Sequence, residues 1–192
     1  DSISLFVDHG NNVLTPLRVS MADGFGSGAY RGAWRGSIQI TKAGTDVRLF
    51  AREDLFAKTD SSNMFTVFAG PYADLVVLLP GETATPGIAP GKIGTALPVE
   101  AGISVPARVQ ATDAYWNPVG DQPAVHLSSS SYFQMISAND QPLGVGGTRD
   151  FEVFFKTATL QTLTVADLIQ PSSNDSGDIV VTPGPFDRLM VI

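Results

Sequence analysis

The sequence offers few side chains that could carry out catalysis. It contains no cysteine and only two histidines, His9 and His126. Thiol chemistry is therefore excluded, and a multi-histidine metal centre has too few ligands. Neither histidine lies in a motif with a serine nucleophile, and the run Ser128-Ser129-Ser130-Ser131 is typical of a polar strand end or loop. The carboxylates are scattered, so no glycosidase-type pair stands out. We expect a protein that is not an enzyme.

Two segments have the composition of ligand-binding loops. Residues 174–178, with the sequence NDSGD, are rich in oxygen ligands and make Ca²⁺ a candidate, although the oxygens are several short of a full coordination shell. The alternative is a solvated turn before the last strand. Residues 87–93 superficially resemble a phosphate-binding loop, but Ile93 stands where a Mg²⁺-binding serine or threonine is needed. We reject that reading and expect no other cofactor.

Aromatic side chains next to turn residues form a third candidate site. Tyr115 and Trp116 lie between Asp113 and Asn117, two residues that readily form Asx turns. Such aromatics commonly cover the end of a core, and the functional alternative is stacking on a sugar. The four lysines, at positions 42, 58, 92 and 156, could form Lys–Asn isopeptide crosslinks, but no context singles one out.

Charge and hydropathy exclude two classes of partner. The 192 residues carry a formal net charge of −7, which argues against binding to nucleic acid or to anionic lipid. No apolar run approaches the roughly 20 residues that span a bilayer, so we expect no membrane insertion. Because the first residue is Asp1, we expect a processed product or a fragment.

The elements that would position these residues are β-strands. Charged residues are sparse at 16%, whereas glycine and proline are plentiful. Residues 105–111 and 161–166 alternate apolar and polar side chains at the period of a half-buried strand. Residues 75–79 are continuously apolar, as in a strand with both faces covered. Residues 52–58 are the best helix candidate and could equally be a loop, so the prediction is all-β.

An internal repeat indicates the domain organisation. Residues 65–78 recur as residues 179–192 with an offset of 114, which aligns Gly70-Pro71 with Gly184-Pro185. Residues 37–43 recur one residue further out of register as residues 152–158. A period of this length has the size of one β-sandwich domain. Each Gly-Pro is then a hinge that closes one domain and opens the next.

This repeat predicts three segments. Residues 1–69 form an incomplete β-sandwich domain that lacks its two opening strands, and residues 70–183 form a complete one. Residues 184–192 supply the opening strand of a following domain or a donor strand. The apolar residues that would carry strand donation or inter-domain contact are Leu189, Met190, Val191 and Ile192. Within the complete domain, the long connection over residues 80–102 is expected to be a hairpin or structured excursion.

The segment Val109-Gln110-Ala111-Thr112-Asp113-Ala114-Tyr115-Trp116-Asn117-Pro118-Val119 resembles the V-x-A-x-D-x-x-x-N-x-V signature of bacterial Ig-like repeats. These repeats occur in tandem in invasin- and intimin-type surface proteins. The resemblance covers the second domain and the later strands of the first, which lacks the Asp-to-Asn turn. It implies two Ig-like β-sandwiches in tandem and an extracellular or cell-surface location.

The function expected from this resemblance is structural. The chain would be a non-enzymatic spacer or adhesive module of a bacterial surface protein or filament, with copies joined head to tail by strand donation as one hypothesis. Its partners would be neighbouring Ig-like domains or copies of itself, with a surface glycan as a further candidate. The alternative is a carbohydrate-binding module of a secreted enzyme, in which aromatics such as Tyr115 and Trp116 contact the sugar.

Overall fold

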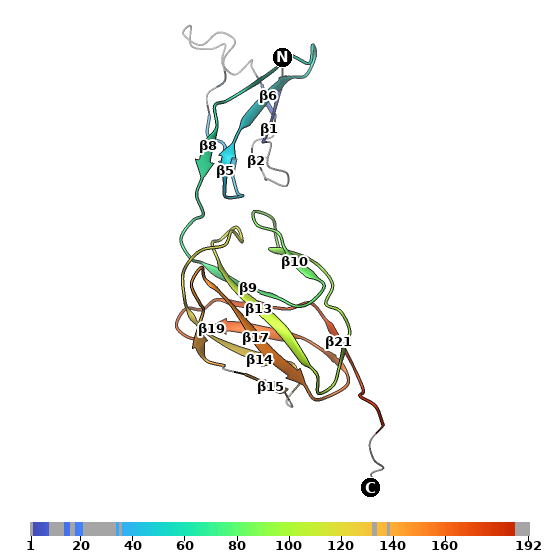
Figure 1. Cartoon of the computed structure of the whole chain (residues 1–192). Coiled ribbons are helices and arrows are strands. Elements are labelled where there is room, and N and C mark those ends of the chain that lie inside the picture. The colour runs from blue at the N-terminus through green and yellow to red at the C-terminus, as the bar shows by residue number, and fades with distance from the viewer. Residues whose placement is uncertain are drawn as a thin grey trace. The chain divides into compact units, whose positions relative to one another are not determined.

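The computed structural model describes residues 2–7, 14–15, 18–20, 34, 36–131, 134–137 and 139–186. Within these ranges every regular element is a β-strand, which confirms the all-β prediction (Figure 1). None of the described segments is a helix that could cross a membrane. The chain forms two compact units, one of Asp1–Ala69 with Pro86–Ile88 and the other of Gly70–Thr85 with Ala89–Ile192.

The second unit is a sandwich of two four-stranded sheets with two smaller sheets. The larger sheets have the strand orders β15-β17-β13-β9 and β16-β14-β19-β20, and the smaller ones are β12-β21-β18 and the hairpin β10-β11. The hairpin confirms the expected excursion over residues 80–102. The strands are β9 (Asp74–Leu78), β10 (Glu82–Ala84), β11 (Lys92–Gly94), β12 (Val99–Glu100), β13 (Ser104–Thr112), β14 (Ala124–Ser129), β15 (Gln134–Ile136), β16 (Gln141–Pro142), β17 (Thr148–Phe155), β18 (Leu160–Gln161), β19 (Leu163–Asp167), β20 (Ser173–Asp175) and β21 (Ile179–Thr182).

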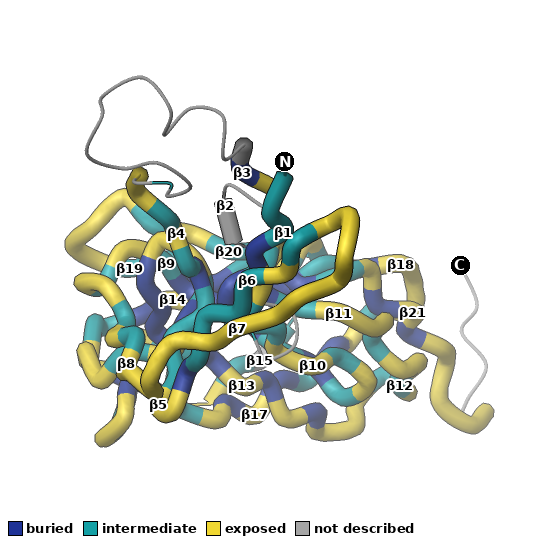
Figure 2. The backbone as a smooth tube through the Cα atoms, turned by 90° about the horizontal axis from the view of Figure 1, so that it is seen from above, coloured by how far each residue is buried: buried dark blue, intermediate teal, exposed yellow. Residues whose placement is uncertain are grey.

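The core of the second unit follows from side-chain alternation. In β13, Val105, Ala107, Val109 and Ala111 are at most 4% exposed, while the residues between them face outward or are only partly covered. These four pack with buried residues of β14, β17 and β19 into one cluster. Strand β9 is buried on both faces, as its continuous apolar run predicts. Figure 2 shows this contrast, with β9 dark and β7 of the first unit exposed along its length.

The first unit has one four-stranded sheet, β3-β1-β6-β7, and two two-stranded sheets, β2-β4 and β5-β8. Its small core is formed by Leu5 and Val19 with partly buried neighbours. The strands are β1 (Ser2–Val7), β2 (Leu14–Thr15), β3 (Arg18–Ser20), β4 (Gln39–Ile40), β5 (Gly44–Val47), β6 (Leu49–Glu53), β7 (Thr59–Ser61) and β8 (Phe65–Val67).

The two units share strand register, as the repeat requires. Ala51 of β6 pairs with Asp60 of β7, and Val165 of β19 pairs with Asn174 of β20. The residue numbers of the second pair are those of the first pair plus 114. The pairing of β5 with β8 is reproduced in the same way by β18 and β21. The sheet β3-β1-β6-β7 therefore has the same order and pairing as β16-β14-β19-β20.

The first unit differs from the second in what covers this sheet. None of its described strands corresponds to β9 or β13, the opening strands of the second unit. The matching core positions are correspondingly less buried. Leu5 is 8% exposed where its counterpart Leu127 is 1%, and Ala51 is half-buried where Val165 is fully buried. Within the described residues, the first unit therefore shows only counterparts of the later strands of the second unit, and its incompleteness stays a prediction.

Some local expectations need correction. The strand expected over residues 161–166 is split into β18 and β19, because Thr162 leaves the ladder and its amide donates to Ser130 Oγ at 2.9 Å. The segment 174–178 is only partly a turn, since β20 includes Asn174 and Asp175. Residues 54–58 form a turn and loop, with Glu53 capping the Leu55 amide at 2.9 Å.

Candidate functional site

A buried carboxylate lies where the chain enters the second unit. Asp113 directly follows β13 and is 2% exposed. Its Oδ2 accepts a hydrogen bond from the Gly70 amide at 2.8 Å, and its Oδ1 accepts from the amides of Tyr115 at 2.8 Å and Asn117 at 3.0 Å. We call this group of Gly70, Asp113, Tyr115 and Asn117 the Asp113 clamp. It ties the predicted hinge glycine to the turn at the end of β13.

Asn117 completes the Asp113 clamp from the other end of the turn. Its side-chain amide donates to both Asp113 oxygens, at 3.2 and 2.9 Å, and its own carbonyl accepts from the Asp113 amide at 2.9 Å. Asn117 is also 2% exposed. The Asp113 carboxylate only accepts and the Asn117 side-chain amide donates to it, so the two short side chains together satisfy the buried polar groups of this turn. This complementarity explains why aspartate and asparagine stand at this spacing.

The electrostatics of the clamp favour the ionised carboxylate. Burial alone would raise the pKa of Asp113, but the side-chain amide of Asn117 and the amides of Gly70, Asn117 and Tyr115 together lower it below its usual value. The carboxylate is therefore charged at neutral pH. Hydrogen bonds to a charged acceptor are stronger than those between neutral groups. The charged Asp113 carboxylate therefore holds the Gly70 amide and the turn strongly.

A second anchor holds the segment that follows the hinge. The Tyr72 hydroxyl donates to Asp167 Oδ2 at 2.7 Å and lies 3.1 Å from Ser172 Oγ. Burial raises the pKa of Tyr72 well above its ordinary value, and the neighbouring Asp167 carboxylate adds to the rise. The phenol thus stays a hydrogen-bond donor, and its ring packs on the core of the second unit. The opening segment Gly70-Pro71-Tyr72 is fixed at both ends.

The two aromatics nominated as ligand contacts have different surroundings. Tyr115 is 40% exposed. Trp116 adopts a positive φ of 59°, and its ring lies against Gly91, where a Cβ would stand 2.2 Å from Trp116 Cδ1. This packing agrees with a lid over the sandwich end, while sugar contact by Tyr115 and Trp116 stays a prediction.

The other nominated residues do not gather into a site. His126 pairs with Asp140 at 2.6 Å in an exposed position, and His9 lies outside the described residues. Leu189, Met190, Val191 and Ile192 also lie outside them. Across the described ranges, no three His, Cys, Asp or Glu side chains are placed to hold a metal ion. In the oxygen-rich segment, Asn174 Oδ1 accepts from the Val77 amide, and calcium binding there stays a prediction.

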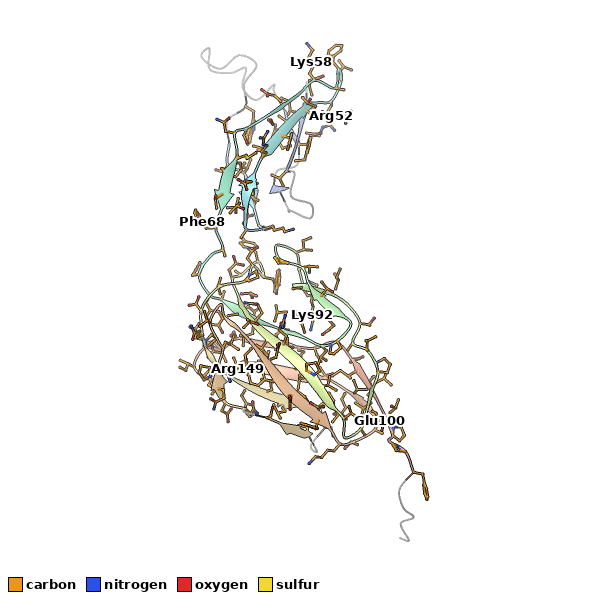
Figure 3. All side chains as sticks on the ribbon, viewed as in Figure 1. Arg52, Lys58, Phe68, Lys92, Glu100 and Arg149 are labelled. Atoms are coloured by element: carbon orange, nitrogen blue, oxygen red, sulfur yellow. The ribbon has the colours of Figure 1, made fainter. Side chains whose placement is uncertain are left out.

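One buried polar group was not predicted from the sequence. Lys92 and Glu82 lie on the β10-β11 hairpin with side chains only 12% and 2% exposed, and Lys92 Nζ is 3.4 Å from Glu82 Oε1. Figure 3 labels Lys92 on this hairpin. Their backbone partners lie on or just after β9 and β20, so this pair depends on contacts between segments that are distant in the sequence. One indication of this buried pair is present in the sequence, namely that Lys92 is one of only four lysines in the chain.

Fold and clamp together define an all-β protein whose second unit is a β-sandwich. No protein-family model and no curated protein matches the chain. Among solved structures, it is similar to the D0-D1 domain of intimin, with 10% identity, a TM-score of 0.41 and coverage of 94% of this chain and 80% of that one.

Two further solved structures show the same kind of similarity. The D00-D0 domain of intimin shares 12% identity, with a TM-score of 0.42 and coverage of 93% and 84%. Domains 4 and 5 of the S-layer protein SbsC share 15%, with a TM-score of 0.38 and coverage of 70% and 65%. The fold assignment itself rests on the strand order and register given above.

Proposed function

We propose that the chain is a non-enzymatic structural and adhesive module of an extracellular bacterial surface protein or filament. In this role, Ig-like sandwiches act as rigid spacers, and the connection between them limits bending. The observation that carries the proposal is the Asp113 clamp, in which a buried, charged carboxylate holds the amide of the hinge residue Gly70. A connection anchored in this way loses much of the freedom that a glycine would otherwise give it.

The repeat supports an extension of the array. Gly184-Pro185-Phe186 repeats Gly70-Pro71-Tyr72, and Phe186 is 80% exposed whereas the Tyr72 ring packs on a sandwich core. A neighbouring sandwich with its own clamp would bind the Gly184 amide and cover Phe186. The partners are thus neighbouring Ig-like domains. The net charge of −7 would keep such an array soluble outside the cell.

The experiment that tests the clamp measures the distance between the two units. Because the chain contains no cysteine, Thr59→Cys and Lys156→Cys provide two unique spin-labelling sites, both exposed and one on each unit. We expect a narrow distance distribution in the otherwise native chain. We expect a clearly broader one after Asp113→Asn, since the amide cannot accept all the hydrogen bonds of the carboxylate.

Asp121→Asn serves as the matched control, because Asp121 is exposed and close to the clamp in sequence. It should leave the distribution unchanged. A broad distribution in the native chain, or an equally narrow one after Asp113→Asn, would show that the clamp does not limit bending.

A specific observation favours a second proposal, assembly of copies head to tail. The first unit has no described counterpart of β9 and β13, and its sheet is less buried than the matching sheet of the second unit. Leu189, Met190, Val191 and Ile192 repeat the apolar run of β9. We propose that this segment of one copy adds a strand to the first unit of another, through backbone hydrogen bonds and apolar pockets.

Sedimentation of the isolated chain over a range of concentrations tests this assembly. We expect a ladder of sizes that grows with concentration, and its loss after Val191→Pro, since proline removes a ladder donor from the added strand. Pro185→Ala, outside the apolar run, is the control and should keep the ladder. A strict monomer at every concentration would refute the proposal.

A further inference from the structure

Three polar side chains seal the seam between the two large sheets of the second unit. Lys92 Nζ donates to the carbonyls of Val77 on β9, at 2.9 Å, and of Asp175 on β20, at 2.8 Å. Asn174 Oδ1 accepts from the Val77 amide at 3.2 Å. Glu82 accepts from the amides of Leu79, at 2.8 Å, and Gly177, at 3.1 Å. We call Lys92, Glu82 and Asn174 the seam triad.

The seam triad brings an amine, a carboxamide and a carboxylate to one place. The N–H and C=O of one residue in an extended strand point to the same side. Because Val77 uses its N–H for Asn174 and its C=O for Lys92, both side chains meet at the same edge of β9. Glu82 Oε1 lies 3.4 Å from Lys92 Nζ. The lysine and glutamate side chains are almost fully shielded from water.

We propose that Lys92 and Asn174 form an intramolecular isopeptide bond, with Glu82 as the proton carrier. Lys92 Nζ loses a proton to the Glu82 carboxylate, and its lone pair attacks Asn174 Cγ to form the Nζ–Cγ bond. The Cγ–Nδ2 bond then breaks. The two protons that leave Nζ pass through Glu82 to Nδ2, which departs as an ammonium ion. Charge and atoms balance without an oxidant or any other reactant.

The surroundings favour each step. Burial lowers the pKa of Lys92, although Glu82 opposes the shift, so the neutral amine required for attack is more accessible than in water. The Val77 amide already donates to Asn174 Oδ1 and would stabilise the negative charge that develops on this oxygen. Both reacting side chains are hydrogen-bonded to Val77 in the folded unit, so that a fixed geometry replaces a random encounter.

The bond would join the β10-β11 hairpin covalently to β20. Lys92 belongs to β11 and Asn174 to β20, so the link closes a loop of many residues within the second unit. A crosslink of this kind restricts the unfolded chain more than the folded one, by the same reasoning that applies to a disulfide. The inference is independent of the spacer function, because it concerns the chemistry of one unit alone.

Intact mass spectrometry of the folded full chain tests the proposal. We expect the mass to fall below that of the sequence by one ammonia, and a proteolytic digest to contain a branched peptide that joins Lys92 to Asn174. Lys92→Met and Glu82→Gln should each restore the full mass. Lys156→Met removes an exposed lysine and is the matched control, which should keep the loss.

Three results would overturn the proposal. The first is a folded native chain with its full mass. The second is a loss of ammonia without the branched peptide, because cyclisation of Asn174 onto its own backbone loses the same mass. The third is a loss that persists in Lys92→Met. Circular dichroism of each variant shows whether it folds, and the measurement on the native chain decides the question even if a variant does not.

Discussion

Asp113→Ala should destabilise the second unit by about 3 kcal/mol, because it leaves the buried amides of the clamp without their charged acceptor. Asp113 accepts five hydrogen bonds, from Gly70, Tyr115 and three times from Asn117. Water cannot replace this acceptor readily, since Asp113 and Asn117 are each 2% exposed. Urea unfolding, followed by the fluorescence of Trp116 in a Trp34→Phe background, measures the loss.

The control for this prediction is Asp121→Ala, which removes an exposed carboxylate and should change the free energy of unfolding by no more than about 0.5 kcal/mol. An equal effect of the two substitutions would contradict the assignment of Asp113 as the anchor of the turn. The loss should also be smaller in Asp113→Asn, which keeps the shape and part of the hydrogen bonding.

The clamp also gives the stability a defined dependence on pH. The pKa of Asp113 is lower in the folded state than its model-peptide value of 3.8. The unfolded chain therefore binds the proton more readily, and the contribution of Asp113 is complete above the unfolded pKa and disappears as the pH falls through the folded pKa. The free energy of unfolding should drop in acid, and this part of the drop should be absent in Asp113→Ala.

Gly91→Ala should have a similarly large effect, again about 3 kcal/mol, from two additive causes. Gly91 has a φ of +85°, which costs an alanine about 1 kcal/mol. Its new Cβ would stand 2.2 Å from Trp116 Cδ1, so the ring must move out of its packed position, at a further cost of about 2 kcal/mol. Thermal or urea unfolding of the full chain measures the sum.

Gly102 provides the matched control for Gly91. Its φ is +87°, and no atom lies within 4 Å of the Cβ that an alanine would add. Gly102→Ala should therefore cost only the backbone share, about 1 kcal/mol. Equal losses at positions 91 and 102 would show that the Trp116 ring does not resist displacement. In a Trp116→Ala background, the additional cost of Gly91→Ala should fall to the value at Gly102.

Much of the fold was accessible from the sequence because it depends on local alternation and on the repeat. The alternating pattern of β13 and the continuous apolar run of β9 both match their burial. The repeat offset of 114 appears again in the pairing of Val165 with Asn174 and of Ala51 with Asp60. The Asx turn between Asp113 and Asn117 is local, and its two ends are four residues apart.

The parts that escaped prediction depend on contacts between distant segments. Nothing near Gly70 in the sequence indicates that its amide binds a carboxylate 43 residues later. The seam triad similarly joins residues 82, 92 and 174, which no periodicity links. The break between β18 and β19 was missed because threonine is common in strands. Only the hydrogen bond from the Thr162 amide to Ser130 reveals that Thr162 leaves the ladder.

The pairing of β21, the last described strand, determines how the second unit would resist a mechanical force. Strand β21 runs parallel to β12, with Val99 beside Val181, and antiparallel to β18. A force applied along the chain at Gly184 would therefore slide β21 lengthwise past two neighbours. Hydrogen bonds across such an arrangement lie across the direction of pull and must rupture together, whereas a hairpin pulled from its open end separates one bond at a time.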